Sequence, residues 1–253
     1  MKKARVLLYD IETAPIIGPS WQIRESDTLW VIQDWYMLCF AWKWLDEKKT
    51  QVITLQDFKG YKKNPQSDLE LMKKLHELFT EADIVIGHNS DRFDNRKANA
   101  RFILNGLQPP TPYQTVDTLK LARRHFGFSS NRLDHLGDYL GVGRKIKTDL
   151  DLWKRCMAGD PKAFKEMAKY NIQDVKLLED VYLKLRPWAT THPNMANLEG
   201  RPEACPICGV EGFMWAQGIR YTKTGQYRRW QCKDCGAYSS QRKGEKDVAP
   251  NFT

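Results

Sequence analysis

Residues 7–13, LLYDIET, constrain the fold more than any other stretch of the chain. Their apolar residues predict a buried strand, and this strand carries two acids, Asp10 and Glu12. Because side chains alternate along a strand, the two acids point to the same side. Neighbouring carboxylates repel each other, so a hard divalent cation that holds both is the simplest explanation. Taken alone, the pair is equally consistent with ordinary acids at a strand end.

Composition indicates a basic globular protein. The 253 residues include 40 Lys and Arg against 31 Asp and Glu, a formal net charge of +9. Positive charge favours a polyanionic partner, because neutralised phosphates release counterions and supply affinity that is independent of base sequence. No apolar run approaches the ~20 residues of a membrane helix, and residues 1–5 lead into a strand instead of a secretion signal. We therefore expect a cytoplasmic protein that does not associate with membranes.

The order of the expected elements predicts an α/β fold. Three strands come first and form an antiparallel meander, after which helices and strands alternate. This order favours a mixed five-stranded sheet with flanking helices. The expected strands are residues 7–13, 37–45, 51–55, 84–87 and 114–116. The expected helices are residues 68–79, 91–104, 117–125, 133–139 and 161–185.

A change of composition after this region predicts a second, smaller domain. Residues 1–186 contain the expected α/β domain, and residues 187–203 carry three prolines without a helical or strand period, as in a linker. Residues 204–240 are rich in cysteine, glycine, arginine and aromatic side chains. The last segment, residues 241–253, is expected to be a loose tail.

Four of the six cysteines form two matched Cys-x-x-Cys pairs in the smaller domain. Cys205 and Cys208 are separated by 23 residues from Cys232 and Cys235. Four thiolates at this spacing suit one tetrahedral structural Zn²⁺, and a glycine after each pair lets the backbone turn. A redox pair explains one such motif but not two matched ones. The module resembles a zinc ribbon.

Cations and flat rings alternate between the two cysteine pairs. Hairpin strands are expected at residues 213–221 and 227–232. Arginine contacts with phosphates, together with stacking of bases on aromatic rings, hold single strands of nucleic acid. A competing explanation makes the rings the core of a tiny domain and the charges its solvated surface. The predicted substrate-binding residues here are Arg220, Tyr221, Arg228, Arg229 and Trp230.

Two further motifs supply acids that could join the first pair. Residues 88–94, HNSDRFD, follow the fourth expected strand and open a helix, where ligand sites of α/β sheets usually form. Tyr170 and Asp174 lie four residues apart, on one face of the last expected helix. Each also has a structural explanation, since Tyr170 could pack in the core and Asp174 could be a solvated helix residue.

In this order and at these distances, the three motifs resemble those of the DEDD superfamily of 3′–5′ exonucleases, and the tyrosine resembles its DEDDy branch. The resemblance covers roughly residues 5–185, and it implies a ribonuclease H-like fold with two-metal hydrolysis of phosphodiesters. The implied ligands of two Mg²⁺ or Mn²⁺ ions are Asp10, Glu12, Asp94 and Asp174. It also implies that Tyr170 orients the attacking water and that Asn89 contacts substrate or braces its loop.

The sequence thus predicts a metal-dependent 3′–5′ exonuclease whose ribbon holds nucleic acid, with single-stranded DNA favoured over RNA. Alternatives are a structure-selective endonuclease or RNA-processing nuclease on the same scaffold, and a non-catalytic nucleic-acid-binding protein. By resemblance, a bacterial or phage-encoded protein of replication or repair is expected, with other proteins of those processes as partners. Lys145 and Lys147 either contact the strand or belong to a solvated loop.

Overall fold

The computed structural model describes residues 3–22, 27–223 and 225–240. Contacts divide the chain into two compact units, one of which is Arg5–Val181. The other comprises Met1–Ala4 and Tyr182–Thr253. The expected loose tail, residues 241–253, lies outside the described residues. Within the described part of the chain, every helix is too short or too polar to cross a bilayer.

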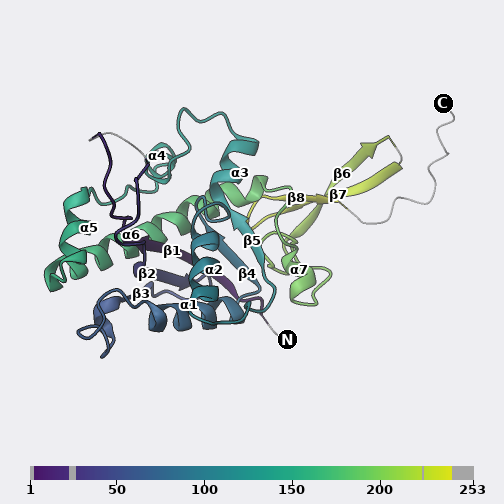
Figure 1. The fold of residues 1–253 in the computed structure, drawn as a ribbon. Helices are drawn as coiled ribbons and strands as arrows, with labels where there is room; N and C mark the ends of the chain where they lie inside the picture. Colours follow the sequence, from purple (N-terminus) through teal and green to yellow (C-terminus); the bar gives the residue numbers. More distant parts are fainter. Residues whose placement is uncertain (1–2, 23–26, 224, 241–253) are drawn as a thin grey trace. The chain divides into compact units, whose positions relative to one another are not determined.

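The larger unit is built on a mixed five-stranded sheet (Figure 1). Its strands are β1 Val6–Thr13, β2 Met37–Trp44, β3 Gln51–Thr54, β4 Ile84–Gly87 and β5 Gln114–Asp117. They lie in the order β3-β2-β1-β4-β5. The central strand β1 pairs antiparallel with β2 and parallel with β4. The prediction of a mixed five-stranded sheet is confirmed, and the chain places its acid-bearing strand at the centre.

Helices flank the sheet, as predicted. They are α1 Leu69–Glu81, α2 Asp94–Leu104, α3 Thr118–His125, α4 Leu133–Tyr139, α5 Leu150–Met157 and α6 Pro161–Leu185. Helix α5 was not predicted from the sequence, although Asp149 caps it by accepting a hydrogen bond from the amide of Asp151. Leu152 and Cys156 are its buried residues. Two buried positions in eight residues give too weak a period to predict a helix.

The two sides of β1 have different environments. Leu7, Tyr9 and Ile11 alternate along the strand and belong to the large apolar core. The ring of Tyr9 meets Phe79 of α1 edge-on at 5.1 Å, and its hydroxyl donates to Asn95 of α2 at 2.6 Å. Helices α1 and α2 therefore cover this side. The acids of β1 point to the other side.

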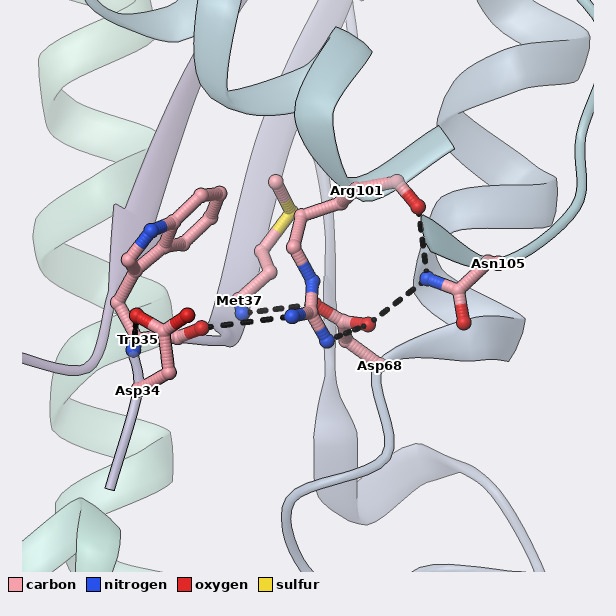
Figure 2. A network of polar contacts seen from close by, with 6 residues as sticks. All are labelled: Asp34, Trp35, Met37, Asp68, Arg101 and Asn105. Atoms are coloured by element: carbon pink, nitrogen blue, oxygen red, sulfur yellow. Dashed lines mark hydrogen bonds and ion pairs between the residues drawn. The ribbon is translucent and has the colours of Figure 1, made fainter. Parts of the chain in front are cut away.

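A buried ion pair ties α2 to the start of β2 (Figure 2). The carboxylate of Asp68 is fully buried, and Nε and Nη2 of Arg101 each lie 2.6 Å from one of its oxygens. The amide of Met37 donates to the same carboxylate at 3.0 Å, and the side chain of Asn105 donates at 3.2 Å. Asp68 thus joins three segments that are distant in the sequence.

The smaller unit contains a three-stranded antiparallel sheet. Its strands are β6 Met214–Thr222, β7 Gly225–Cys232 and β8 Tyr238–Ser240, in the order β6-β7-β8. The hairpin was predicted, whereas β8 was not. The expected linker is partly helical, because it holds the short helix α7 Met195–Leu198, whose residues Met195 and Ala196 are buried. Four residues are too few to produce a recognisable period in the sequence.

Candidate metal centres

Three acids meet beside β1. Asp10 and Glu12 lie on the same side of the strand, as predicted, and α6 brings Asp174 to them. One carboxylate oxygen from each residue lies within 4.8 Å of those of the other two. Oxygens this close together can share a hard divalent cation. The structure therefore forms most of the predicted acid site from segments at opposite ends of the larger unit.

Asp94 lies beside this trio and is not one of its members. It is the first residue of α2, and its carboxylate accepts a long hydrogen bond, 3.4 Å, from the amide of Ile11. Its charge contributes to raising the pKa of Asp10, after the larger effect of burial. The fourth predicted ligand is thus adjacent to the site, beside Ile11 and Asp10, without meeting the mutual 4.8 Å spacing of the trio.

Burial is the main cause of a raised pKa at every predicted ligand. The pKa of Glu12 rises to about 8 because of burial and then the charge of Asp174. Burial raises the pKa of Asp94 to about 7, and it raises the pKa of Asp10 and of Asp174 as well. Charged carboxylates gathered out of water are unfavourable unless cations compensate them.

One carboxylate oxygen of the cluster is available to a metal ion. Oδ1 of Asp174 is buried and has no hydrogen-bond partner among the described residues. A buried acceptor without a partner costs free energy. All-oxygen donors are what Mg²⁺ and Mn²⁺ prefer. The four acids therefore fit the divalent ions that the fold implies.

The raised pKa values predict a pH-dependent stability in buffer without added Mg²⁺ or Mn²⁺. Between about pH 4.5 and pH 8 the folded protein keeps a proton on Glu12 that the unfolded chain releases, so stability falls as pH rises through this window. We expect the Tm to fall by roughly 10 °C across it. Thermal unfolding from pH 5 to pH 8.5 measures this. Added Mg²⁺ should reduce the fall, and Glu12→Gln should flatten it; equal slopes for both proteins would contradict the prediction.

Lys145 lies among the acids, whereas its sequence was equally consistent with a solvated loop. Its Nζ lies 2.6 Å from Oδ2 of Asp174 and 3.2 Å from the hydroxyl of Tyr170. Burial lowers the pKa of Lys145, but the charges of Asp174 and Asp10 outweigh this and raise it above its ordinary value. Lys147 is exposed. Of the two lysines, the structure places Lys145 in the acid cluster and Lys147 in solvent.

Two further side chains hold the acids, and neither was predicted from the sequence. Asn171 of α6 is fully buried and donates to Oδ2 of Asp10 at 2.6 Å. Trp153 of α5 hydrogen-bonds Glu12, which lowers the pKa of that carboxyl, and its ring meets Tyr170 edge-on at 6.0 Å. Asn171 had a signal, because it is a polar residue three positions before Asp174 on the buried face of a helix.

The loop between β4 and α2 is held by Asp117 at the end of β5. The carboxylate of Asp117 accepts hydrogen bonds from the amides of Asn89, at 2.9 Å, and Asp91, at 3.3 Å. Asn89 has a φ of 63°, a left-handed conformation that asparagine adopts more readily than most residues. The backbone contact agrees with a bracing role for Asn89, while its substrate contact stays a prediction.

The four cysteines of the smaller unit converge as predicted. The sulfurs of Cys205, Cys208, Cys232 and Cys235 all lie within 4.8 Å of one another. The Sγ atoms of Cys205 and Cys235 are 3.7 Å apart, as are those of Cys208 and Cys232. Sulfurs at the corners of a tetrahedron around Zn²⁺, with Zn–S bonds of ~2.3 Å, are ~3.8 Å apart. The cluster therefore fits a zinc ribbon.

The five predicted substrate-binding residues of the ribbon do not form one surface. Arg220 of β6 pairs with Tyr227 of β7, and Tyr221 pairs with Gln226. Tyr227 and Arg229 lie two residues apart on β7, so their side chains point to the same face. Arg220, as the partner of Tyr227, shares that face. Tyr221, Arg228 and Trp230 share the opposite face. Neighbours in sequence are thus separated by the sheet.

Comparison with known families places this fold. Residues 33–186, more than half of the chain, match the family model described as the RNase H superfamily. The chain belongs to the RNase H superfamily. The matched segment includes Asp94, Tyr170 and Asp174, and it begins after β1. The ribonuclease H-like fold expected from the motifs is confirmed, and membership of this superfamily supports a nuclease.

This RNase H superfamily member is similar to one plant protein in sequence and to one DNA polymerase in structure. Protein NEN3 of Arabidopsis thaliana is 32% identical over 84 residues, which are 32% of this chain and 16% of that protein. The family B DNA polymerase of the hyperthermophilic archaeon Pyrobaculum calidifontis matches with a TM-score of 0.54 and 19% identity, over 74% of this chain and 25% of the polymerase. The chain thus spans a quarter or less of each relative, and the polymerase likeness shows a shared fold.

Proposed function

We propose that the chain is a metal-dependent 3′–5′ exonuclease that hydrolyses phosphodiester bonds of single-stranded DNA. The convergence of Asp10, Glu12 and Asp174 carries the proposal, together with the oxygen of Asp174 that lacks a partner within the described parts of the chain. The DEDDy-like order of the motifs supports it. So does the fold likeness to a family B DNA polymerase.

The acids would hold two Mg²⁺ or Mn²⁺ ions through Asp10, Glu12, Asp94 and Asp174. When bound, such ions activate a water molecule and stabilise the leaving oxygen. The chain's own residues would fix the donors in place. Asn171 holds one oxygen of Asp10, and Asp117 holds the loop that leads to Asp94. In the smaller unit, the four cysteines would hold one structural Zn²⁺ and so shape a ribbon that assists substrate binding.

Tyr170 would orient the attacking water, as the resemblance implies. Its hydroxyl lies 3.2 Å from Nζ of Lys145, and its ring rests against Trp153. Burial and then the charge of Asp174 raise the pKa of the phenol above its ordinary value. The hydroxyl therefore stays protonated near pH 7, so it positions a water by hydrogen bonding and does not act as a base.

Replacing Lys145 should lower kcat by about tenfold or more, as for residues that orient metal ligands. Lys145→Met removes the ammonium group that contacts Asp174 and Tyr170 while keeping an unbranched apolar stem. The Mg²⁺ concentration needed for half-maximal activity should not rise, because the acids lose a competing positive charge. Steady-state rates over a Mg²⁺ series measure both quantities.

The control for Lys145 is two residues away. Lys147→Met removes the same charge from an exposed position and should change kcat less than twofold. If the two variants lost activity equally, the loss would reflect the general charge of the loop and not the contacts of Lys145.

Digestion of oligonucleotides tests the proposed function. Single-stranded DNA, duplex DNA and RNA of one sequence, each 5′-labelled, are incubated with Mg²⁺, with Mn²⁺ and with chelator. We expect a ladder that shortens one nucleotide at a time from the 3′ end, fastest on single-stranded DNA and absent in chelator. Internal cuts would indicate an endonuclease, and faster loss of RNA an RNA-processing enzyme. Binding without cleavage would indicate a non-catalytic protein.

A further inference from the structure

The register of the ribbon sheet gives its two faces different chemistry. Gln231 of β7 is the direct cross-strand neighbour of Trp215 of β6 on one side and of Tyr238 of β8 on the other. Alternation along β7 places Arg229 on the same face, and Arg229 is paired with Ser240. We call this surface the Trp215 face. Its residues are Trp215, Arg220, Tyr227, Arg229, Gln231 and Tyr238.

Rings on the Trp215 face are exposed and carry cations. Trp215 is 45% exposed and Tyr238 is 56% exposed. Nζ of Lys233 lies 4.9 Å from the centre of the Trp215 ring, and Cζ of Arg229 lies 5.6 Å from the centre of the Tyr238 ring. The face therefore presents two cation–ring pairs, and these are the chemical groups that hold a stacked base and its phosphate.

The arginines of this face are anchored on it. Nε of Arg229 donates to the carbonyl of Gln217 at 2.9 Å, and Nη1 of Arg220 reaches the hydroxyl of Ser240 at 3.5 Å. Each guanidinium still has further N–H groups, since arginine carries five. Their side chains are thereby held on one face, and the ordering that a phosphate contact requires is partly complete before binding.

The opposite face serves the core of the ribbon at its cysteine end. Met214 and Cys232 are direct neighbours on it, and both belong to the apolar cluster around the cysteines. Trp230 is the next residue of β7 on that face and is partly buried. The two explanations of the ribbon's rings therefore apply to different faces, with packing at Trp230 and exposure at Trp215.

We propose that the Trp215 face binds single-stranded nucleic acid, with bases stacked on Trp215 and Tyr238 and phosphates against Arg220, Arg229 and Lys233. The inference rests on the proposed nuclease function and specifies where its ribbon holds the strand. Trp215 and Tyr238 lie two strand spacings apart, about 10 Å. About three stacked nucleotides span this distance at 3.4 Å each. An acidic protein would be attracted by the cations but would gain little from the ring faces.

The test uses adjacent arginines that point to opposite faces. Arg229→Ala and Arg228→Ala are each made in the full chain carrying Asp174→Asn, so that the strand is not degraded. Binding of a fluorescent 20-nucleotide thymidine strand is measured from 50 to 300 mM salt. We expect Arg229→Ala to weaken binding about threefold and to reduce the salt slope by about 0.7, the value for one phosphate contact. Arg228→Ala should change affinity less than twofold and leave the slope unchanged.

A ring variant tests stacking independently of charge. Trp215→Ala should weaken binding to the thymidine strand about tenfold and leave the salt slope unchanged. Zinc content and thermal unfolding confirm that each variant keeps its folded ribbon. Equal losses for Arg228→Ala and Arg229→Ala, or full affinity in Trp215→Ala, would overturn the inference. Competition by poly-glutamate as strong as by the strand would also overturn it, in favour of an acidic partner.

A separate substrate distinguishes failure of this inference from failure of the nuclease proposal. The p-nitrophenyl ester of thymidine 5′-monophosphate carries one base and one phosphodiester. Its hydrolysis by the unsubstituted protein with Mn²⁺ reports on the acid cluster. If the protein hydrolyses the ester but Arg228→Ala and Arg229→Ala weaken strand binding equally, only the ribbon inference is overturned. If only the variants of the Trp215 face weaken strand binding and the ester is not hydrolysed, the result contradicts the nuclease proposal instead.

Discussion

Replacing Asp174 by asparagine should lower the rate of phosphodiester hydrolysis by at least about a thousandfold. The substitution keeps the shape of the side chain but removes the charge that a divalent ion needs. Asp174 is fully buried, its Oδ1 has no partner among the described residues, and its Oδ2 contacts Lys145. Metal ions stabilise charge in such reactions by several kcal/mol, and each ~1.4 kcal/mol is tenfold in rate. Initial rates on 5′-labelled single-stranded DNA measure the loss.

Asp180 provides a matched control on the same helix. It lies in α6 and is exposed, so Asp180→Asn should keep activity within about twofold of the unsubstituted protein. Thermal unfolding of both variants shows whether the helix is intact. A ladder produced by Asp174→Asn at the original rate would contradict the assignment of this residue as a metal ligand.

Replacing Asp68 by alanine should have the largest effect on stability, a loss of about 3–5 kcal/mol, because it leaves a charged arginine without its buried partner. Arg101 would lose two hydrogen bonds of 2.6 Å, and the amide of Met37 would lose its acceptor (Figure 2). For a chain of this size such a loss lowers the Tm by roughly 10 °C. Chemical denaturation gives the free energy of unfolding directly.

An exposed ion pair provides the contrast for Asp68. Glu70 lies 2.7 Å from Lys73 on α1, with both side chains about half exposed. Glu70→Ala should lower the free energy of unfolding by about 0.5 kcal/mol or less, because solvent screens such pairs. The double substitution Asp68→Leu with Arg101→Met should be less damaging than Asp68→Ala, since no charge remains buried without a partner. Comparable losses for Asp68→Ala and Glu70→Ala would show that burial does not determine the effect.

Features that depend on short-range periodicity were predictable from the sequence. Asp10 and Glu12 share a side of β1 because a strand alternates with period two, and Gly209 and Gly236 turn the chain after the cysteine pairs with φ of 75° and 80°. The sheet and most helices follow from apolar patterns of the same kind. These predictions needed no knowledge of which segments meet in space.

Contacts that depend on tertiary closure were not predictable. Lys145 lies in an irregular stretch between α4 and α5, and nothing in its neighbours indicates that it reaches Asp174. Asp117 looks like an ordinary helix cap, because its bonds to the amides of Asn89 and Asp91 form only when β4 and β5 pair. Trp153 belongs to a helix whose period was too weak to detect.

The ribbon has features of both kinds, one predictable from strand alternation and one that depends on how the strands pair. The separation of Arg228 from Arg229 follows from alternation alone and could have been derived from the sequence. Their partners on β6 could not, because the register shifts between Ala216 and Ile219. Such a bulge changes which side chains of the two strands share a face. The position of Trp215 and Tyr238 on either side of Gln231 therefore became visible only in the folded sheet.

The ammonium group of Lys145 gives the acid cluster a resident counter-ion. Its Nζ lies 2.6 Å from Oδ2 of Asp174, so part of the negative charge of the cluster is balanced by a side chain of the protein itself. Under the proposed metal-dependent function, the fold would therefore not require bound divalent ions to balance the charge of Asp174, because Lys145 already contacts that carboxylate.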